Sequence, residues 1–550
     1  MRRIAISIII IINILCLTCL NIYALPLDME YRFRGTVTMY VGRSDAYFGC
    51  EKLKIDPSNE EVVPLIVNDR MLLPLRFVAE SFDAGVEWDQ STKSALLTTD
   101  SATACVTADE DGMLINGEKL ILDQAAFIWE DRMYLPIRAI AEQVLGQKVF
   151  YYDGLVIIGD AAELFDEEAD EDILGRMIHF ITGEVKEPLE LYPITNRYPG
   201  AQEGFGEIGY IDYNGNVVIS IGEGKHLEYY EGLVCGLYQI GDGPTSDVFY
   251  DKENKVVLDL SKIVEGQKLS SHYFREGMAI CSVWDEVQRT TYYGAINKKG
   301  ELVVKPKFKW MEDYSDGLSR VSYDGKTYGF VDRNGKMVIE PKFTVIELSG
   351  SHWTDFSFSE GLAVIATGTE ENPEYAYIDK NGNIAFEGRF KKAGCFHYGL
   401  AAVKVEIDGV DKAGYINKKG EFVVSPEYNY TYDFSDGLGC ATKNGEKFFF
   451  NRKGEEVLSF SGMEEAEIRT DFHEGFTEIS VKGEDGYTRY GFMNKKGEIA
   501  IEPKFVATFD FQGGLALVVT EDWHVGYIKT DGTFVWQRYL EEDERSYFVL

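Results

Sequence analysis

An acidic residue three positions ahead of a glycine is the first pattern in this sequence that suggests chemistry. In the stretch YGFVDRNGKMVIEPKF, residues 328–343, Asp332 and Asn334 precede Gly335, which suggests a calcium-binding loop. Such a loop needs several oxygen ligands, usually carboxylates, in the spacing D-x-[DN]-x-[DN]-G, and that spacing is absent. A turn needs only an Asx side chain that accepts hydrogen bonds from the backbone ahead, and a glycine in the left-handed position. Because related stretches have Asn at the first position, the sequence favours a turn over a metal site (Asn297, Asn417, Asn451, Asn494).

Other arrangements that would indicate an enzyme are missing. The sequence has neither a G-x-S-x-G nucleophile elbow nor an H-E-x-x-H zinc motif, and HEGFT at 473–477 falls inside a repeat. The glycines of GFVDRNGK at 329–336 have the wrong spacing for a phosphate-binding loop, and no Ser or Thr follows Lys336. Acidic residues such as Glu360 and Asp436 stand beside glycines at predicted turns in many copies, where a structural role is favoured over acid–base catalysis. We therefore predict no catalytic residue, no cofactor and no metal ion.

The stretch at 328–343 belongs to a repeat. Nine stretches carry this turn, at 209–219, 248–258, 293–308, 328–343, 375–390, 414–428, 448–458, 490–505 and 526–536. A second signature, an aromatic residue followed by two residues, Gly and usually Leu, alternates with them. Its glycines fall 38 to 45 residues apart (Gly232, Gly277, Gly317, Gly361, Gly399, Gly437, Gly475, Gly514). A period near 40 residues predicts an array of similar units.

The local pattern within one unit predicts short antiparallel strands. LSRVSY at 318–323 alternates apolar and polar residues, and Asp324-Gly325 offers a tight turn into the next strand. Asn334-Gly335 turns the chain again, and Pro341 ends the third strand. Three or four strands per unit match one blade of a β-propeller or one coil of a β-rich solenoid.

The two alternating signatures resemble a known repeat. FSEGLA together with G-Y-I-[DN]-K-x-G-x-[IV]-[IV]-x-P-x-F is similar to the bacterial WG repeat over residues 205–538. The resemblance implies an all-β, propeller-like array of about 8 repeats, with a β-rich solenoid as the alternative. None of the copies has the Trp that gives the repeat its name. Tyr stands there as an aromatic substitute in three copies (Tyr293, Tyr328, Tyr490), and Ala413 or Val525 stands there in others.

Residues 27–160 are expected to form a separate domain that contains an internal sequence repeat. RMLLPLRFVAE at 70–80 recurs as RMYLPIRAIAE at 132–142. In each copy a short strand leads into a proline (Pro74, Pro136) that suits a helix start, and a further strand follows. The helices place apolar residues on one face, Leu75, Val78 and Ala79 in the first and Ile137, Ile140 and Ala141 in the second. The pattern predicts an α+β domain.

The stretch LPLRFVAESFDAGVEWD carries a second resemblance. Over residues 60–158 the sequence is similar to the small stalk-like N-terminal domain of copper amine oxidases, an appendage of exported bacterial proteins. The oxidase chemistry belongs to another domain, which needs a quinone-forming Tyr in T-x-x-N-Y-[DE]-Y and copper-binding histidines. The nearest phrase here, YNYTYDF at 428–434, has Thr431 in the acidic position, and the seven histidines include no H-x-H pair. We therefore expect neither copper nor quinone.

The first 24 residues are typical of an export signal. Met1-Arg2-Arg3 precedes an apolar run from Ile4 to Leu20. Ala24 is a small residue at a plausible cleavage position, and an uncleaved membrane anchor remains an alternative. The sequence thus predicts a secreted or cell-surface protein of a bacterium.

Charge and cysteine content restrict the possible partners. The formal charge of −36 argues against nucleic acid, whose phosphates are bound by clustered Lys and Arg. Cysteines outside the signal are too sparse for a disulfide scaffold, although Cys50 and Cys105 are a possible pair. A segment rich in acidic residues, 161–204, is expected to be a solvated linker or a polar helix, and 539–550 a C-terminal tail.

These features favour a non-enzymatic interaction protein of the cell envelope, whose repeat array binds a protein or glycan partner. An extracytoplasmic hydrolase or lyase with its active site on the propeller face is the alternative. The insertion at 344–358 departs from the repeat, and insertions in arrays often form a binding face. It supplies the candidate contact residues His352, Trp353 and Asp355.

Overall fold

The computed structural model describes residues 28–167, 170–183, 191–196, 208–224, 229–230, 233–239, 244–251, 253–263, 269–271, 273–344, 356–368, 373–459, 466–545 and 548. The predicted signal segment, residues 1–24, lies outside this part of the chain. In the described residues, no helix combines the length and apolar character needed to cross a membrane.

The N-terminal domain has the predicted strand-helix-strand pattern twice. Strand β5 (Arg70–Pro74) leads into α3 (Leu75–Ser81) and β6 (Gly85–Asp89), and β12 (Arg132–Pro136) leads into α4 (Ile137–Ala141) and β13 (Val149–Tyr152). Both prolines occupy the position just before the helix. The predicted apolar faces of both helices are buried, which confirms the α+β prediction.

Three antiparallel sheets build this domain. Two have five strands, in the orders β13-β14-β1-β2-β3 and β10-β9-β8-β7-β6, and the third has four, in the order β11-β12-β5-β4. Their remaining strands are β1 (Val37–Tyr40), β2 (Asp45–Phe48), β3 (Glu51–Lys54), β4 (Leu65–Val67), β7 (Ser94–Thr98), β8 (Thr103–Thr107), β9 (Gly112–Ile115), β10 (Glu118–Ile121), β11 (Phe127–Trp129) and β14 (Leu155–Ile158). Cys105 on β8 has a free thiol, so no disulfide joins it to Cys50.

The repeats form short antiparallel meanders. A typical unit consists of β26 (Trp310–Met311), β27 (Leu318–Ser322), β28 (Thr327–Asp332) and β29 (Met337–Thr344), paired in chain order. The predicted turn lies between β28 and β29: the Asp332 carboxylate accepts hydrogen bonds from the backbone N–H groups of Asn334 and Lys336. The sequence predicts about 8 repeats, and the described residues contain nine such turns.

The other repeat strands are β15 (Tyr192–Thr195), β16 (Ile208–Ile211), β17 (Val217–Gly224), β18 (Tyr229–Tyr230), β19 (Leu233–Gln239), β20 (Pro244–Tyr250), β21 (Val256–Asp259), β22 (Ser270–Ser271), β23 (Met278–Asp285), β24 (Thr290–Asn297), β25 (Leu302–Phe308), β30 (Phe358–Ser359), β31 (Leu362–Ala366), β32 (Tyr375–Asp379), β33 (Lys392–His397), β34 (Leu400–Ile407), β35 (Val410–Asn417), β36 (Phe422–Tyr428), β37 (Tyr430–Thr431), β38 (Gly439–Lys443), β39 (Glu446–Phe450), β40 (Glu456–Ser459), β41 (Ala466–Ile468), β42 (Phe476–Lys482), β43 (Thr488–Asn494), β44 (Ile499–Thr508), β45 (Leu515–Thr520), β46 (His524–Lys529) and β47 (Phe534–Tyr539).

The glycine of the Tyr-Gly pair is required by a close backbone approach. The β28–β29 register shifts between Tyr328 and Phe330, as at a β-bulge. A Cβ atom on Gly329 would lie 2.2 Å from the carbonyl oxygen of Ile339. Since Tyr328 itself is buried, Tyr fills the aromatic position that the repeat requires.

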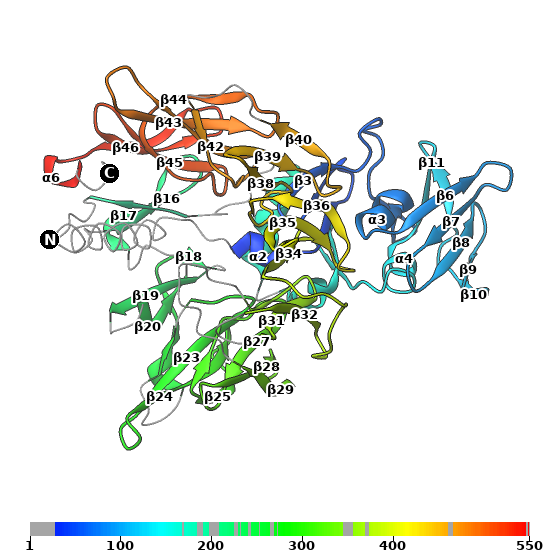
Figure 1. Cartoon of the computed structure of the whole chain (residues 1–550), viewed down its shortest axis with the longest axis horizontal. Coiled ribbons are helices and arrows are strands. Elements are labelled where there is room, and N and C mark those ends of the chain that lie inside the picture. The colour runs from blue at the N-terminus through cyan, green and yellow to red at the C-terminus, as the bar shows by residue number, and fades with distance from the viewer. Residues whose placement is uncertain are drawn as a thin grey trace.

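The array closes on itself. One hydrophobic cluster combines buried residues of β15, β16 and β17 with buried residues of β45 and β46, and also includes Leu540 and Phe548. The Tyr527 hydroxyl donates to the Pro193 carbonyl at 3.0 Å across this junction. In Figure 1, β16 and β17 accordingly lie beside β45 and β46. The fold is therefore an α+β domain followed by a closed, propeller-like β array.

The segment expected to be an acidic linker, 161–204, contains ordered structure. It includes most of η2 (Asp160–Leu164), all of α5 (Glu171–Thr182) and β15. Helix α5 buries a row of apolar side chains against the N-terminal domain (Ile173, Leu174, Met177, Ile178, Ile181). Because this segment is rich in acidic residues, the sequence suggests a solvated linker. Composition alone does not show that its apolar residues form one face of α5. Residues of the expected tail form α6 (Glu542–Arg545).

Candidate functional site

The aromatic-x-x-Gly-Leu signature forms tight two-residue turns on the side of the repeats that faces the N-terminal domain. In one turn, Ser315 and Leu318 exchange both backbone hydrogen bonds, and the intervening Asp316 and Gly317 have φ of 55° and 81°. Two consecutive positive φ angles define the type I′ turn, which suits the twist of antiparallel strands.

In five of the described turns, the acidic residue joins one repeat to the next. The Glu276 carboxylate accepts the backbone N–H groups of Asp316 at 2.7 Å and Gly317 at 2.8 Å. Four further carboxylates accept N–H groups in the same way, Asp316 from Gly361, Glu360 from Gly399, Asp436 from Gly475, and Glu474 from Gly513 and Gly514. The structural role predicted for Glu360 and Asp436 is confirmed. We call these contacts the carboxylate latches.

Lysines of the Asx turns neutralise three latches. Lys380 lies 2.9 Å from Asp316, Lys418 lies 3.1 Å from Glu360, and Lys495 lies 2.8 Å from Asp436. Each lysine directly follows the first residue of its Asx turn, so the two repeat signatures meet in space. The lysines thus offset the cost of placing carboxylates inside the protein.

One turn has Tyr398 at the position where most of the other turns have an acidic residue. Here the N-terminal domain supplies the contact instead of a carboxylate latch. The Tyr398 ring lies against Phe48 of β2, with ring centroids 6.3 Å apart. The guanidinium of Arg452 stacks over Phe48 at 3.5 Å and donates to the Tyr398 carbonyl at 3.1 Å. Glu51 of the N-terminal domain lies close to Gly437 of the following turn: an added Cβ on Gly437 would lie 2.2 Å from the Glu51 carboxyl carbon. Burial raises the pKa of Glu51.

Further contacts fix one part of the N-terminal domain at the centre of the repeats. Helix α2 (Asp28–Phe33) lies there in Figure 1, surrounded by repeat strands. Arg275 stacks over Tyr31 at 3.5 Å, and Arg34 donates to the Ser359 hydroxyl at 3.2 Å. The Leu164 carbonyl of η2 accepts from Arg333 at 2.6 Å. This face of the array is therefore covered by the protein's own N-terminal domain.

A groove of about 1230 Å³ opens between the two domains. One wall comes from α3, β6 and the loops around β4 and β12, and the other from the turns around Tyr398, Lys418 and Lys453. Seven cationic and six acidic side chains line it, although the whole chain has 55 basic and 91 acidic residues. The groove is thus a nearly neutral polar surface on a strongly acidic protein.

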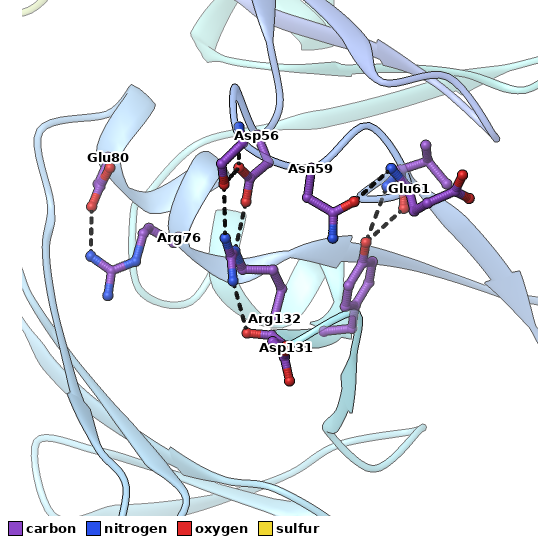
Figure 2. A network of polar contacts seen from close by, with 10 residues as sticks. Asp56, Asn59, Glu61, Arg76, Glu80, Asp131 and Arg132 are labelled. Carbon is purple, nitrogen blue, oxygen red and sulfur yellow. Dashed lines mark hydrogen bonds and ion pairs between the residues drawn. The ribbon is translucent and has the colours of Figure 1, made fainter.

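Ion pairs organise the N-terminal wall (Figure 2). Arg132 lies 2.6 Å from Asp56, and Arg76 lies 3.0 Å from Glu80. Although burial opposes the effect, hydrogen bonds from Ser58 and Arg132 lower the pKa of Asp56. Asp56 therefore remains an anion at neutral pH, fixed by its partners as a hydrogen-bond acceptor.

An aromatic ring lies beside these polar pairs. Trp88 of β6 is 38% exposed and lines the groove, and its indole N–H donates to Gln90 at 2.9 Å. Lys419 reaches across to Asp100 at 2.6 Å, so an exposed ion pair links the two domains. The groove combines a flat apolar surface with planar hydrogen-bonding groups, an arrangement suited to a polar ligand with apolar faces.

One group of side chains within the described residues has the composition of a metal site. Asp471, His473 and Asp510 offer ligand atoms within 4.8 Å of one another. Arg469 already contacts both carboxylates, at 2.7 Å and 2.9 Å, and supplies the positive charge that a metal would bring. Although burial opposes the effect, contacts with His473 and Arg469 lower the pKa of Asp471 to about 2. We interpret the group as a structural ion-pair network.

The candidate contact residues predicted from sequence, His352, Trp353 and Asp355, lie outside the described residues. The groove was not predicted. Trp88 stands in the stretch GVEWD, which was assigned to the fold of the N-terminal domain, and no local pattern marks it as a surface residue. Its role depends on a wall that comes from residues more than 300 positions later.

Comparisons with known families agree with this architecture. Residues 36–155 match the copper amine oxidase N-terminal domain. Five segments match the WG containing repeat, at 293–326, 328–349, 375–406, 414–446 and 490–522. A search of curated proteins finds no match.

Solved structures with a similar course of the chain include three of low identity. A eukaryotic initiation factor is 10% identical, with a TM-score of 0.39, and the match covers 64% of this chain and 96% of that one. BamB from Moraxella catarrhalis is 12% identical, with a TM-score of 0.25, over 49% and 82% of the two chains. The β-propeller domain of the Trilobed protease from Pyrococcus furiosus is 11% identical, with a TM-score of 0.25, over 51% and 98%.

Proposed function

Because the chain consists of a copper amine oxidase N-terminal domain followed by WG repeats, we propose that it is a non-enzymatic binding protein of the bacterial cell envelope. In this proposal the groove between the two domains holds a segment of a wall glycan. The repeats form one wall, and the N-terminal domain forms the other. Neither part would bind the glycan as tightly alone.

The composition of the groove is the observation that carries the proposal. Its volume of about 1230 Å³ exceeds the ~300–1,000 Å³ of common small-molecule pockets, so it has room for several sugar units. The exposed face of Trp88 suits the C–H face of a sugar ring, and the Arg132–Asp56 pair offers donors and acceptors to hydroxyl groups. A near-neutral lining also avoids the repulsion that the rest of this acidic chain would exert on an anionic polymer.

The predicted export signal supports the same role. The basic residues at positions 2 and 3 and the apolar run to Leu20 have the composition of a signal segment. The fractionation test is simple: the protein should be recovered outside the cytoplasm, and N-terminal sequencing should show whether cleavage follows Ala24.

Calorimetric titration with soluble oligosaccharides released from bacterial cell wall tests the binding proposal. Trp88→Ala should weaken binding at least about tenfold, because loss of a buried aromatic contact commonly removes more than 1 kcal/mol. Trp284→Ala is the matched control, since Trp284 is 52% exposed on β23, outside the groove. The control should bind as tightly as the unchanged protein.

Two outcomes would contradict the proposal. If the oligosaccharides produced no heat, or if Trp88→Ala bound them normally, the groove would not be the glycan site. Turnover of the oligosaccharides that one carboxylate substitution abolished would favour the alternative of an extracytoplasmic hydrolase or lyase.

A further inference from the structure

The outer face of the sheet β10-β9-β8-β7-β6 carries an exposed row of side chains that takes no part in the groove. The strand register places Glu87, Leu96, Cys105, Leu114 and Lys119 side by side across the five strands. Leu96 is 40% exposed and Leu114 is 47% exposed. The opposite face of the sheet is buried in the core of the domain. In Figure 1 these strands lie at the end of the molecule away from the repeats.

The order of this row makes it complementary to itself. Cys105 lies on the central strand, with a leucine on each side, an acidic residue at one end and a basic residue at the other. A two-fold axis parallel to β8, between two facing sheets, would place Lys119 opposite Glu87 of the partner subunit. It would also place Leu96 opposite Leu114 of the partner subunit. An isologous interface requires this kind of self-complementarity.

The perpendicular two-fold axis, which runs across the strands, gives a poorer match. It would place Glu87 opposite the partner's Glu87 and Lys119 opposite the partner's Lys119. Directly opposed like charges are unfavourable, so the charge order selects the axis parallel to β8.

We propose that this face is a homodimer interface, with a second copy of the chain as its occupant. Five strands about 4.8 Å apart, each four or five residues long, cover about 400 Å² per copy. Stable interfaces bury about 800 Å² per partner, so the dimer is weak and forms where the local concentration is high. None of the five residues of the row lines the groove, so the interface does not use the groove.

The charged ends of the row are available for such a contact. Lys119 has one neighbouring carboxylate, Asp111 at 3.7 Å, and both side chains are more than half exposed. An exposed pair of this kind contributes little to stability, so Lys119 can turn to a partner at small cost. Glu87 is exposed at the opposite edge, on β6.

Sedimentation velocity of the full chain over a wide concentration range tests the interface. A dimer should appear at high concentration and weaken with added salt, since salt screens the two rim pairs. Glu87→Lys alone and Lys119→Glu alone should each weaken dimerisation at least about tenfold, because each creates two like-charge pairs. An equimolar mixture of these two variants should form a heterodimer, and the double variant Glu87→Lys/Lys119→Glu should dimerise like the unchanged protein.

Two controls distinguish the proposed dimer interface from nonspecific hydrophobic association. Ile66→Asp changes an exposed residue on β4, outside the row, and should leave dimerisation unchanged. Facing sheets lie about 10 Å apart, so the two Cys105 residues should be joined by a short bis-maleimide but not by a direct disulfide. Cys105→Ser should abolish the cross-link.

The proposal is overturned if the protein stays monomeric at the highest soluble concentration. It is equally overturned if single charge reversals leave a dimer intact, or if the mixture of reversed variants stays monomeric while each variant keeps its thermal midpoint.

Discussion

Replacing Glu276 with glutamine removes one acceptor oxygen from a carboxylate latch without changing the size of the side chain. Glu276 is 4% exposed, and its two oxygens accept the N–H groups of Asp316 and Gly317. In Glu276→Gln the amide oxygen can serve one N–H, while the amide NH₂ faces the other. A hydrogen bond to a charged group contributes about 1.5–3 kcal/mol, so we expect a loss of about 3 kcal/mol in the free energy of unfolding.

Urea unfolding gives the total effect, and amide hydrogen exchange gives its location. Peptides that contain residues 312–322 should lose protection first, because the turn at Asp316 loses an acceptor. Glu421→Gln is the matched control: Glu421 is exposed and accepts from Asn417 at 2.9 Å, so its replacement should change stability by less than about 0.5 kcal/mol. If Glu276→Gln also changed stability by less than that, with protection unaltered, the latches would not hold neighbouring repeats together.

The remaining predictions concern the Asx turns and the contact with the N-terminal domain. Gly335→Val should lower the free energy of unfolding by about 3 kcal/mol, because φ is +78° and a Cβ would lie 2.8 Å from the Val303 carbonyl oxygen. Gly325→Val has similar φ but open space, so a smaller loss in urea unfolding is expected, and an equal loss would refute the steric explanation. Asp332→Asn should be nearly neutral with or without calcium in thermal unfolding, since an Asn oxygen accepts the same backbone bonds; destabilisation only in the presence of calcium would favour a metal site. Burial lowers the pKa of His397 well below its usual value, so below about pH 6.5 this residue binds more protons in the unfolded chain than in the folded one. The contribution of His397 to stability should therefore fall with pH, by at most about 1.4 kcal/mol per pH unit. His397→Asn should flatten that dependence, and an unchanged pH profile would contradict this account.

The sequence predicted those structural features that depend on residues close together in the chain. The turn at Asp332 depends on one side chain and its own backbone, and the faces of α3 and α4 depend on helical spacing, so both are visible in a short window. The latch at Glu276 joins residues about 40 positions apart, and the acidic residue alone does not reveal its partner. Tyr398 stands where other turns have the acidic residue of a latch, which the sequence shows. Its contact with Phe48 of the N-terminal domain becomes visible only when the two domains are seen together. The groove around Trp88 also depends on residues far apart in the sequence, so the sequence could not predict it. The sequence pointed to the insertion at 344–358 instead, because that segment departs from the repeat.

The closure between the first and last repeats has a consequence for the order of folding. Strand β15 begins at Tyr192, but its cluster is completed only by residues between 515 and 548, which are synthesised more than 300 positions later. Contacts of such long sequence separation form late and slowly, because the chain between them must first be ordered. Until then the growing array has an open end with unpaired strand edges, which are prone to misassembly. The N-terminal domain emerges long before this step, and its contacts with Arg275, Ser359, Arg452 and the turn at Tyr398 offer successive repeats a fixed platform. We therefore expect the N-terminal domain to serve as a template for the assembly of the repeats, and the residues between 515 and 548 to close the ring.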